Sequence, residues 1–218
     1  VERGPCPLEE SDVQADIQTV RFEMPDNSVL PAEVSRLLAG IGPVTQGQQR
    51  IAAVCDIRDR ANAALRNARY IAGVQIPPQE ISNGELRLVV VLGRITNVVV
   101  NGDPSRFRNT LEARIADMKS QYPLNEAELE RLLLIAGDTP GLDITLALRS
   151  AGGQPGELLG ELNIETSRGA LYANVQNTGS RQLGRELATV RGELYGLTGL
   201  DDLSYLSYTN SAQWREQH

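Results

Sequence analysis

The stretch YIAGVQIPPQEISNGELRLVVVLGRITNVVVNG, from Tyr70 to Gly102, decides how the fold of this chain is interpreted. It begins with a short extended segment, which Pro77 and Pro78 stop. Asn83-Gly84 is the strongest turn signal in the chain, because both residue types tolerate a positive φ angle. The stretch therefore predicts a strand, a connection and a second strand.

The second of these strands, from Leu86 to Leu92, is unusually apolar, with side chains alternating between two faces. Gly93-Arg94 is a minimal break, and a third strand from Ile95 to Val100 follows at once. So short a crossover indicates that one small unit ends here and that another begins.

The residues before this stretch complete the first unit. Alternating apolar residues predict a half-buried strand from Ile17 to Met24. Apolar residues at helical spacing predict one helix around residues 30–38 and another from Gln48 to Ala68. The expected order of the first unit is therefore β-α-α-β-β.

The same order then repeats. A helix starts at Asp103-Pro104-Ser105, and Asn125 caps a further helix. An alternating strand follows from Leu142 to Leu148, and a last strand passes through Leu162 and Ile164. Periodicity alone predicts two tandem β-α-α-β-β units and an α+β fold.

From Arg168 the pattern changes to three segments separated by Gly, Ser or Asp turns. In the first segment Leu171, Ala173 and Val175 face one way, and the residues between them face the other. This rhythm, with late aromatic residues, is typical of transmembrane β-barrel strands. A soluble β-meander has the same rhythm, and the residues by themselves favour the meander.

The Tyr70–Gly102 stretch resembles the end of a POTRA domain in the haemolysin-activator (two-partner secretion) family of outer-membrane transporters. The family's pattern is a Gln after one or two prolines, then Gly-Xaa-Leu entering an apolar strand that ends in Gly-Arg-Ile. The matching residues are Gln79, Gly84, Leu86, Gly93, Arg94 and Ile95. The resemblance implies that both β-α-α-β-β units are POTRA domains.

The segment after Arg168 also resembles the family's first barrel strands, with Asp201-Asp202 where the family has Gly-Asp. It implies the antiparallel β-strands of a truncated transmembrane β-barrel, since a few strands alone cannot form a pore. The expected parts are a lead-in over residues 1–16, POTRA domain 1 over 17–93, POTRA domain 2 over 94–167 and the start of the barrel over 168–218.

Two cysteines, Cys6 and Cys55, match no metal-binding motif. Their spacing leaves two alternatives open: two free thiols, or one disulfide formed in an oxidising compartment. The resemblance favours the disulfide, because the family often has a cysteine just before the first POTRA strand and another in its second helix.

Composition bounds the partners and the compartment. The net charge of −7 and the interspersed arginines argue against a nucleic-acid partner, which requires clustered basic residues. No apolar run reaches the roughly 18 residues of a membrane-spanning helix. The first residues, VERGPCPLEE, lack the basic end and apolar core of a signal peptide, so we expect a cytoplasmic or an already processed chain. The resemblance implies the periplasm and outer membrane of a Gram-negative bacterium.

The sequence contains no recognisable catalytic arrangement. Its only histidine is the terminal His218, which excludes a Ser-His-Asp or Cys-His site. The glycines at Gly152, Gly153 and Gly156 do not precede the Lys-Ser/Thr helix of a phosphate-binding loop. Metal-ligand spacing is missing too. We predict no enzyme activity, no cofactor and no bound metal.

Binding of a polypeptide is the remaining possibility. In each unit the first strand after the helices is a candidate sheet edge, to which an extended polypeptide can add a strand. Pro77 and Pro78 shorten the first edge, which is a common way of protecting it. The candidate residues are Val74, Gln75, Ile76, Ile144, Leu146 and Leu148.

The resemblance implies a specific function for these edges. POTRA domains of the family receive an unfolded secreted partner, a haemolysin or adhesin, through its N-terminal secretion domain and pass it to the barrel for export. The alternative is a POTRA scaffold that assembles envelope proteins during outer-membrane protein biogenesis without translocating a substrate. The barrel-like segment after Arg168 favours the transporter.

Overall fold

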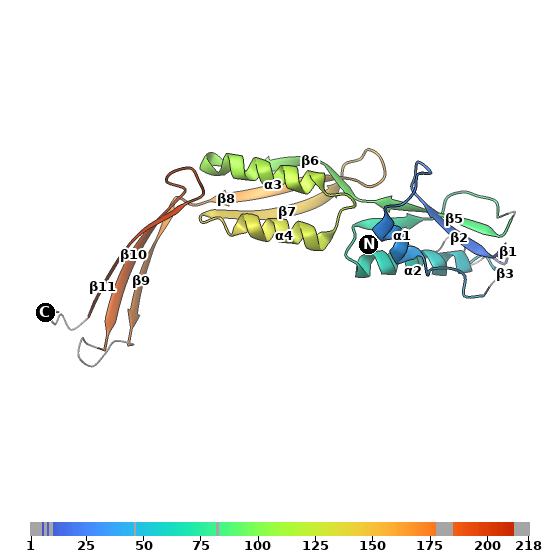
Figure 1. Ribbon diagram of the computed structural model, residues 1–218, viewed down its shortest axis with the longest axis horizontal. Coiled ribbons are helices and arrows are strands. Elements are labelled where there is room, and N and C mark those ends of the chain that lie inside the picture. The colour runs from blue at the N-terminus through green and yellow to red at the C-terminus, as the bar shows by residue number, and fades with distance from the viewer. Residues whose placement is uncertain are drawn as a thin grey trace. The chain divides into compact units, whose positions relative to one another are not determined.

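The computed structural model describes Cys6, Leu8 and residues 11–45, 47–81, 83–177 and 185–211. Its elements follow the β-α-α-β-β order twice, with one additional short strand before the first repeat, another between its two helices, and three strands at the end (Figure 1). The chain divides into two compact units, which are described separately. Unit 1 contains Val1–Asn97, Lys119–Glu130 and Leu148–Leu159, and unit 2 contains Val98–Met118, Arg131–Ala147 and Gly160–His218. The domain boundaries expected from the sequence stay predictions.

The first repeat is a three-stranded sheet with two helices on one face (Figure 1). Its elements are β1 (Gln14–Ile17), β2 (Thr19–Glu23), α1 (Ala32–Leu38), β3 (Gly47–Arg50), α2 (Ala53–Asn67), β4 (Ala72–Gln75) and β5 (Glu85–Leu92). β5 is central, parallel to β2 and antiparallel to β4. Apolar side chains of both helices and the sheet form one core, which includes Ile17, Val34, Leu38, Leu65, Leu86 and Leu88.

The start of the first repeat differs from the sequence expectation. The single strand expected from Ile17 to Met24 is divided at Gln18 into β1 and β2, so the expected lead-in already contains strand residues. β1 pairs with β3, and the last three residues of β3, Gln48 to Arg50, were expected to open the second helix; α2 begins only at Ala53. A pairing between segments far apart in the sequence has no local signal.

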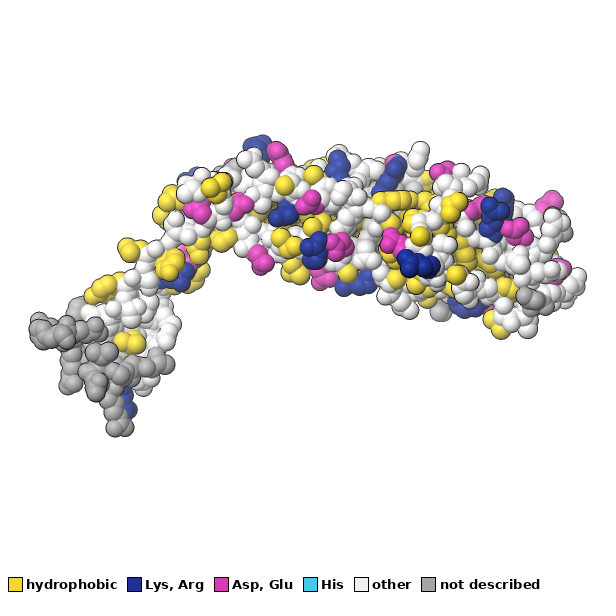
Figure 2. All heavy atoms as spheres, in the orientation of Figure 1, with side chains coloured by type: hydrophobic (Ala, Val, Ile, Leu, Met, Phe, Trp, Pro, Cys, Tyr) yellow, Lys and Arg dark blue, Asp and Glu magenta, His cyan; other side chains and the backbone are white. Residues whose placement is uncertain are grey.

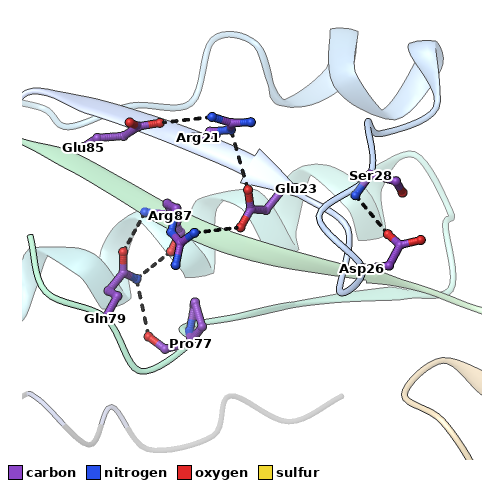
Figure 3. Close-up of polar contacts among 8 residues, drawn as sticks. All are labelled: Arg21, Glu23, Asp26, Ser28, Pro77, Gln79, Glu85 and Arg87. Atoms are coloured by element: carbon purple, nitrogen blue, oxygen red, sulfur yellow. Dashed lines mark hydrogen bonds and ion pairs between the residues drawn. The ribbon is translucent and has the colours of Figure 1, made fainter.

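Gln79 takes the place of a strand residue beside β5 (Figure 3). The β4–β5 register pairs Gln75 with Val89, so the next bonded position would set Pro77 opposite Arg87, and proline has no N–H to donate. The Gln79 amide fills this position. Its Nε2 donates to the Arg87 carbonyl at 2.7 Å, and the Arg87 N–H donates to its Oε1 at 2.8 Å. β5 therefore keeps its hydrogen bonds beyond the two prolines.

A buried carboxylate joins β2 to β5. Arg21 and Arg87 are direct neighbours across this parallel pair, and like charges in such positions destabilise a sheet. Glu23, which is only 6% exposed, lies between them, 3.6 Å from Arg21 Nε and 3.7 Å from an Arg87 terminal nitrogen (Figure 3). The carboxylate offsets the repulsion between the two guanidinium groups.

The second repeat has the same architecture, with both helices on one face of its sheet (Figure 1). It comprises β6 (Arg94–Asn101), a 3-10 turn (Ser105–Phe107), α3 (Arg108–Ser120), α4 (Glu126–Gly137), β7 (Leu142–Ser150) and β8 (Glu157–Thr166), with the strand order β6-β8-β7. Its core includes Phe107, Leu111, Leu142, Leu162 and Ile164. The expected cap is confirmed, because Asn125 Oδ1 accepts the Ala127 N–H at 2.9 Å. Within the described ranges, no helix is both long and apolar enough to cross a membrane.

The last three strands form an antiparallel sheet with one apolar face. β9 (Gly169–Gln176), β10 (Leu187–Tyr195) and β11 (Leu203–Ser211) lie in the order β11-β10-β9. In the strand register, Leu171 and Leu206 lie in one cross-strand row, and Val190 lies in another row with Ala173 and Tyr208. These rows share one face of the sheet, which confirms the predicted two-residue alternation. Hydrophobic side chains are visible on this sheet in Figure 2, and Leu171 and Leu206 are 77% and 82% exposed. The turn expected after the first of these strands falls largely outside the described residues.

Cys6 and Cys55 form a disulfide. Their Cα atoms lie 6.0 Å apart, which is a usual separation for such a bridge. Cys55 is buried in α2. The bridge therefore ties the beginning of the chain to the core of the first repeat.

Replacing Gln79 by alanine should lower the free energy of unfolding by about 1–3 kcal/mol, because two hydrogen bonds to the Arg87 backbone are lost. Urea unfolding followed by circular dichroism measures this. Gln75→Ala is the matched control, since Gln75 is an exposed glutamine of the neighbouring strand β4. Equal midpoints for the two variants would show that Gln79 is not needed for the sheet.

Reducing the disulfide should lower the stability of the first repeat by about 4 kcal/mol, because a long loop is released in the unfolded chain. Thermal unfolding with and without dithiothreitol measures the change. Cys6→Ser leaves the buried Cys55 in place. The unfolding temperature of this variant should match that of the reduced protein and should not change when dithiothreitol is added. A response of Cys6→Ser to dithiothreitol would contradict the assignment.

Candidate polypeptide-binding edge strands

β7 is an end strand of its sheet, so only one side of its backbone pairs with a described strand, β8. Two hydrogen bonds flank the strand: Ser167 N–H to the Gly141 carbonyl at 2.8 Å, and Ala151 N–H to the Glu157 carbonyl at 3.0 Å. Both fit one antiparallel register without a bulge. Because backbone groups alternate in direction along such a strand, the odd-numbered residues of β7 face β8 and the even-numbered ones face away.

Ile144, Leu146 and Leu148, the residues predicted from the sequence, are even-numbered members of β7. Their backbone N–H and C=O groups lie on the side that strand addition requires. The side chains of Ile144 and Leu146 pack against the core of the second repeat, and Leu148 is half-buried. The side chains therefore hold the strand in place, and the backbone is the part that can contact a ligand.

The corresponding edge of the first repeat is partly occupied. The Gly93 N–H donates to the Ile71 carbonyl at 2.7 Å, and this register directs the backbone of Val74 away from β5. The Val74 N–H donates to Asn62 Oδ1 of α2 at 2.8 Å. An added strand would have to displace this bond, so Asn62 protects the edge.

The other two residues predicted on this edge are less suited to binding. Gln75 is exposed, but its backbone is directed at Val89 of β5. Ile76 lies beyond the end of β4 and packs against the core. The two predicted sets belong to different sheets, and the structure does not combine them into one site. The sequence analysis did not identify Asn62 as a residue that protects this edge. The only available signal was that a polar residue stands next to Ala61, which is buried.

Gly93-Arg94, part of the motif that carried the resemblance, is held by close contacts within unit 1. A Cβ atom on Gly93 would lie 2.6 Å from the Ile71 carbonyl oxygen, so only glycine fits. Arg94 donates to a Glu157 carboxylate oxygen at 2.6 Å. This hydrogen bond, together with the N–H of Gln154, holds the pKa of Glu157 below its ordinary value.

A polar ladder runs along the second face of the last sheet. Arg191 and Glu193 form an ion pair at 2.7 Å, and the guanidinium lies 4.1 Å from the centre of the Tyr205 ring. The Tyr195 hydroxyl lies 3.4 Å from that of Tyr172 and donates to Glu193 at 2.8 Å, and these two contacts raise the pKa of Tyr195. One face of this sheet is thus polar while the other is apolar.

The comparisons with known proteins agree with this architecture. The chain is 30% identical over 154 residues to the heme/hemopexin transporter protein HuxB of Haemophilus influenzae strain 86-028NP, which covers 68% of this chain and 26% of HuxB. CdiB from Escherichia coli superposes on 99% of this chain and 39% of its own, with a TM-score of 0.73 at 18% identity. POTRA domains 1–3 of Omp85 from Anabaena cover 70% of this chain and 66% of theirs, with a TM-score of 0.53 at 17% identity. No protein-family model matches.

The fold and these matches define a class of protein, the POTRA-containing transporters, and the described residues contain its POTRA region followed by antiparallel strands. Within that class, the chain belongs to the two-partner secretion transporters, the family to which HuxB belongs. Its place is the periplasm and outer membrane of a Gram-negative bacterium. The chain spans about a quarter of the length of the curated relatives that it matches. Those relatives are transporters rather than enzymes.

The Arg94–Glu157 pair should make stability depend on acid pH. The pKa of Glu157 in the folded protein lies below its unfolded value of about 4.3. The stabilisation by the ion pair is therefore fully present above the unfolded pKa and is lost as the pH falls through the folded pKa. Urea midpoints of the wild type and Glu157→Gln should differ near pH 7 and converge as the pH falls through the lowered pKa of Glu157. Glu80→Gln, at an exposed position, is the control. A difference that does not change with pH would contradict the pairing.

Proposed function

We propose that this chain recognises an extended segment of an unfolded secreted protein in the periplasm and delivers it to the barrel of the full-length transporter for export. The contact is β-strand addition along β7. One observation carries the proposal: Ile144 and Leu146 are anchored by their side chains, while their backbone groups face away from β8.

An anchored edge strand suits a partner that arrives unfolded. Because β7 is already ordered, the conformational entropy lost on binding is mainly that of the added peptide. Backbone hydrogen bonds depend little on sequence, so many extended segments of one long partner can bind in turn.

The helix beside β7 supplies apolar contacts for one face of an added strand. Leu133 of α4 packs in the same cluster as Ile144 and Leu146. The next residues of the helix, Leu134 and Ile135, are 65% and 38% exposed. An added strand presents alternate side chains to the helix side of the sheet, and apolar residues at those positions can pack against α4.

Of the two repeats, the second is the better candidate for this contact. The first edge is short, ends at two prolines and has its central N–H bonded to Asn62. β7 is nine residues long and contains no proline. We therefore assign the secreted partner to β7 rather than to β4.

Replacing Ile144 by proline should weaken binding of the unfolded N-terminal region of the exoprotein encoded beside this chain by about tenfold or more, because one outward N–H is lost and the ring obstructs the incoming strand. Calorimetry on the 218-residue chain measures the affinity. Edge strands tolerate proline, and circular dichroism verifies that the variant is folded.

Ile144→Ala is the matched control for this experiment. It removes at least as many packing atoms as the proline variant but keeps the N–H, so its affinity should stay close to that of the wild type. Equal weakening by proline and alanine would contradict strand addition at β7. No binding by the wild type at roughly 100 μM, a weak limit for a specific contact, would instead support a POTRA scaffold for outer-membrane protein biogenesis.

A further inference from the structure

The turn between β10 and β11, residues 196–202, has a well-defined internal structure. The Gly196 N–H donates to the Asp202 carbonyl at 2.7 Å. The Thr198 N–H and hydroxyl both donate to the Asp202 carboxylate, at 2.9 and 2.6 Å, and these bonds lower the pKa of Asp202. The turn closes on itself through one carboxylate and is therefore a rigid element.

The same turn is bonded to the start of α3 within unit 2. The Arg106 guanidinium donates to the Tyr195 carbonyl and lies 3.4 Å from the Gly196 carbonyl oxygen. The Thr110 hydroxyl donates to the Asp201 carboxylate. Gly196 is packed so closely that a Cβ atom there would lie 2.5 Å from the Arg106 side chain. Residues 196–202, with Arg106 and Thr110, are called the β10–β11 clip below.

Asp201 occupies a position that glycine would fill more easily. Its φ is +57°, in the left-handed region, where non-glycine residues are strained. The two other left-handed positions of the turn, at +59° and +80°, are Gly196 and Gly199. Asp is among the residues that tolerate this region best, and here its carboxylate has a partner on α3. The bond to Thr110 compensates for the backbone strain.

Tyr195, the residue directly before the β10–β11 clip, contacts the beginning of β7. Gly141, which directly precedes the strand, lies against Tyr195, and a Cβ atom at Gly141 would be 2.6 Å from the Tyr195 ring. Tyr195 is 8% exposed, and its N–H donates to the Arg168 carbonyl at 3.1 Å. Tyr195 thus contacts both one end of β7 and the last sheet.

We propose that Asp201 is a positioning residue whose bond to Thr110 fastens the last sheet to the POTRA domain at the end of β7. A peptide that leaves β7 at this end then meets the polar face of the β9–β11 sheet in a fixed register. The role in export rests on the proposed function of β7, whereas the fastening itself does not.

Hydrogen exchange on the 218-residue chain tests the fastening. Asp201→Gly and Thr110→Val should each accelerate amide exchange in residues 196–202 by about tenfold, the effect of losing a hydrogen bond to a charged group. The double variant should exchange no faster than either single variant, because both remove one shared interaction. Asp201→Asn keeps an acceptor and should restore most of the protection.

Thr189→Val is the matched control, because Thr189 loses a hydroxyl bond to Thr209 within the same sheet. It should leave exchange of the turn unchanged. Unchanged or slower exchange in Asp201→Gly would overturn the proposal, because the lost carboxylate bond should outweigh the relief of strain at φ +57°. Unchanged exchange in Thr110→Val, which leaves the backbone of the turn as it is, would overturn it as well.

Export by the full-length transporter tests the consequence. Asp201→Gly should reduce export severalfold while peptide affinity at β7 stays unchanged, which separates positioning from binding. Unchanged export in a variant with faster exchange would overturn the role in export. Failure of the wild type to bind peptide would refute the proposed function of β7 and leave the exchange result valid.

Discussion

The hydrogen bonds that Gln79 makes to the Arg87 backbone are the constraint on which the first repeat depends. β5 is the central strand, and its apolar run can be buried only if its polar backbone is paired on both sides. β4 ends before it can pair with the first half of β5, and Pro77 cannot continue the ladder. A side-chain amide has the donor and the acceptor of a peptide group, so one residue replaces the missing strand.

The two repeats share an architecture but differ at their edges. In the first, Asn62 accepts the outward N–H of Val74, while in the second the strand at the equivalent edge is longer. Duplicated folds need not have duplicated functions, because a single polar side chain on a helix decides whether an edge is protected. This difference is the reason that we assign the proposed binding to the edge of the second repeat and not to that of the first.

Apolar periodicity was sufficient to predict both repeats, their order and the alternating faces of the last sheet, because these patterns repeat every two or three to four residues. Apolar periodicity failed to predict contacts between segments that are distant in the sequence. The β1–β3 pairing, the late start of α2 at Ala53 and the bond from Val74 to Asn62 depend on contacts that no local pattern contains. Five of the six candidate edge residues lie on end strands, and Ile76 lies beyond the end of β4. Which edge is accessible could be decided only from hydrogen bonds.

The sheet of β9, β10 and β11 determines how this chain behaves in water. A single layer with an apolar face and a polar face is an amphiphile, and Val175 and Leu206 on its apolar face are 73% and 82% exposed. Apolar patches of this kind are uncommon on soluble monomers. The chain thus combines two repeats that bury their apolar side chains in cores with a sheet that leaves its apolar face exposed. By the hydrophobic effect, this face has the composition of a surface that favours an apolar environment over water.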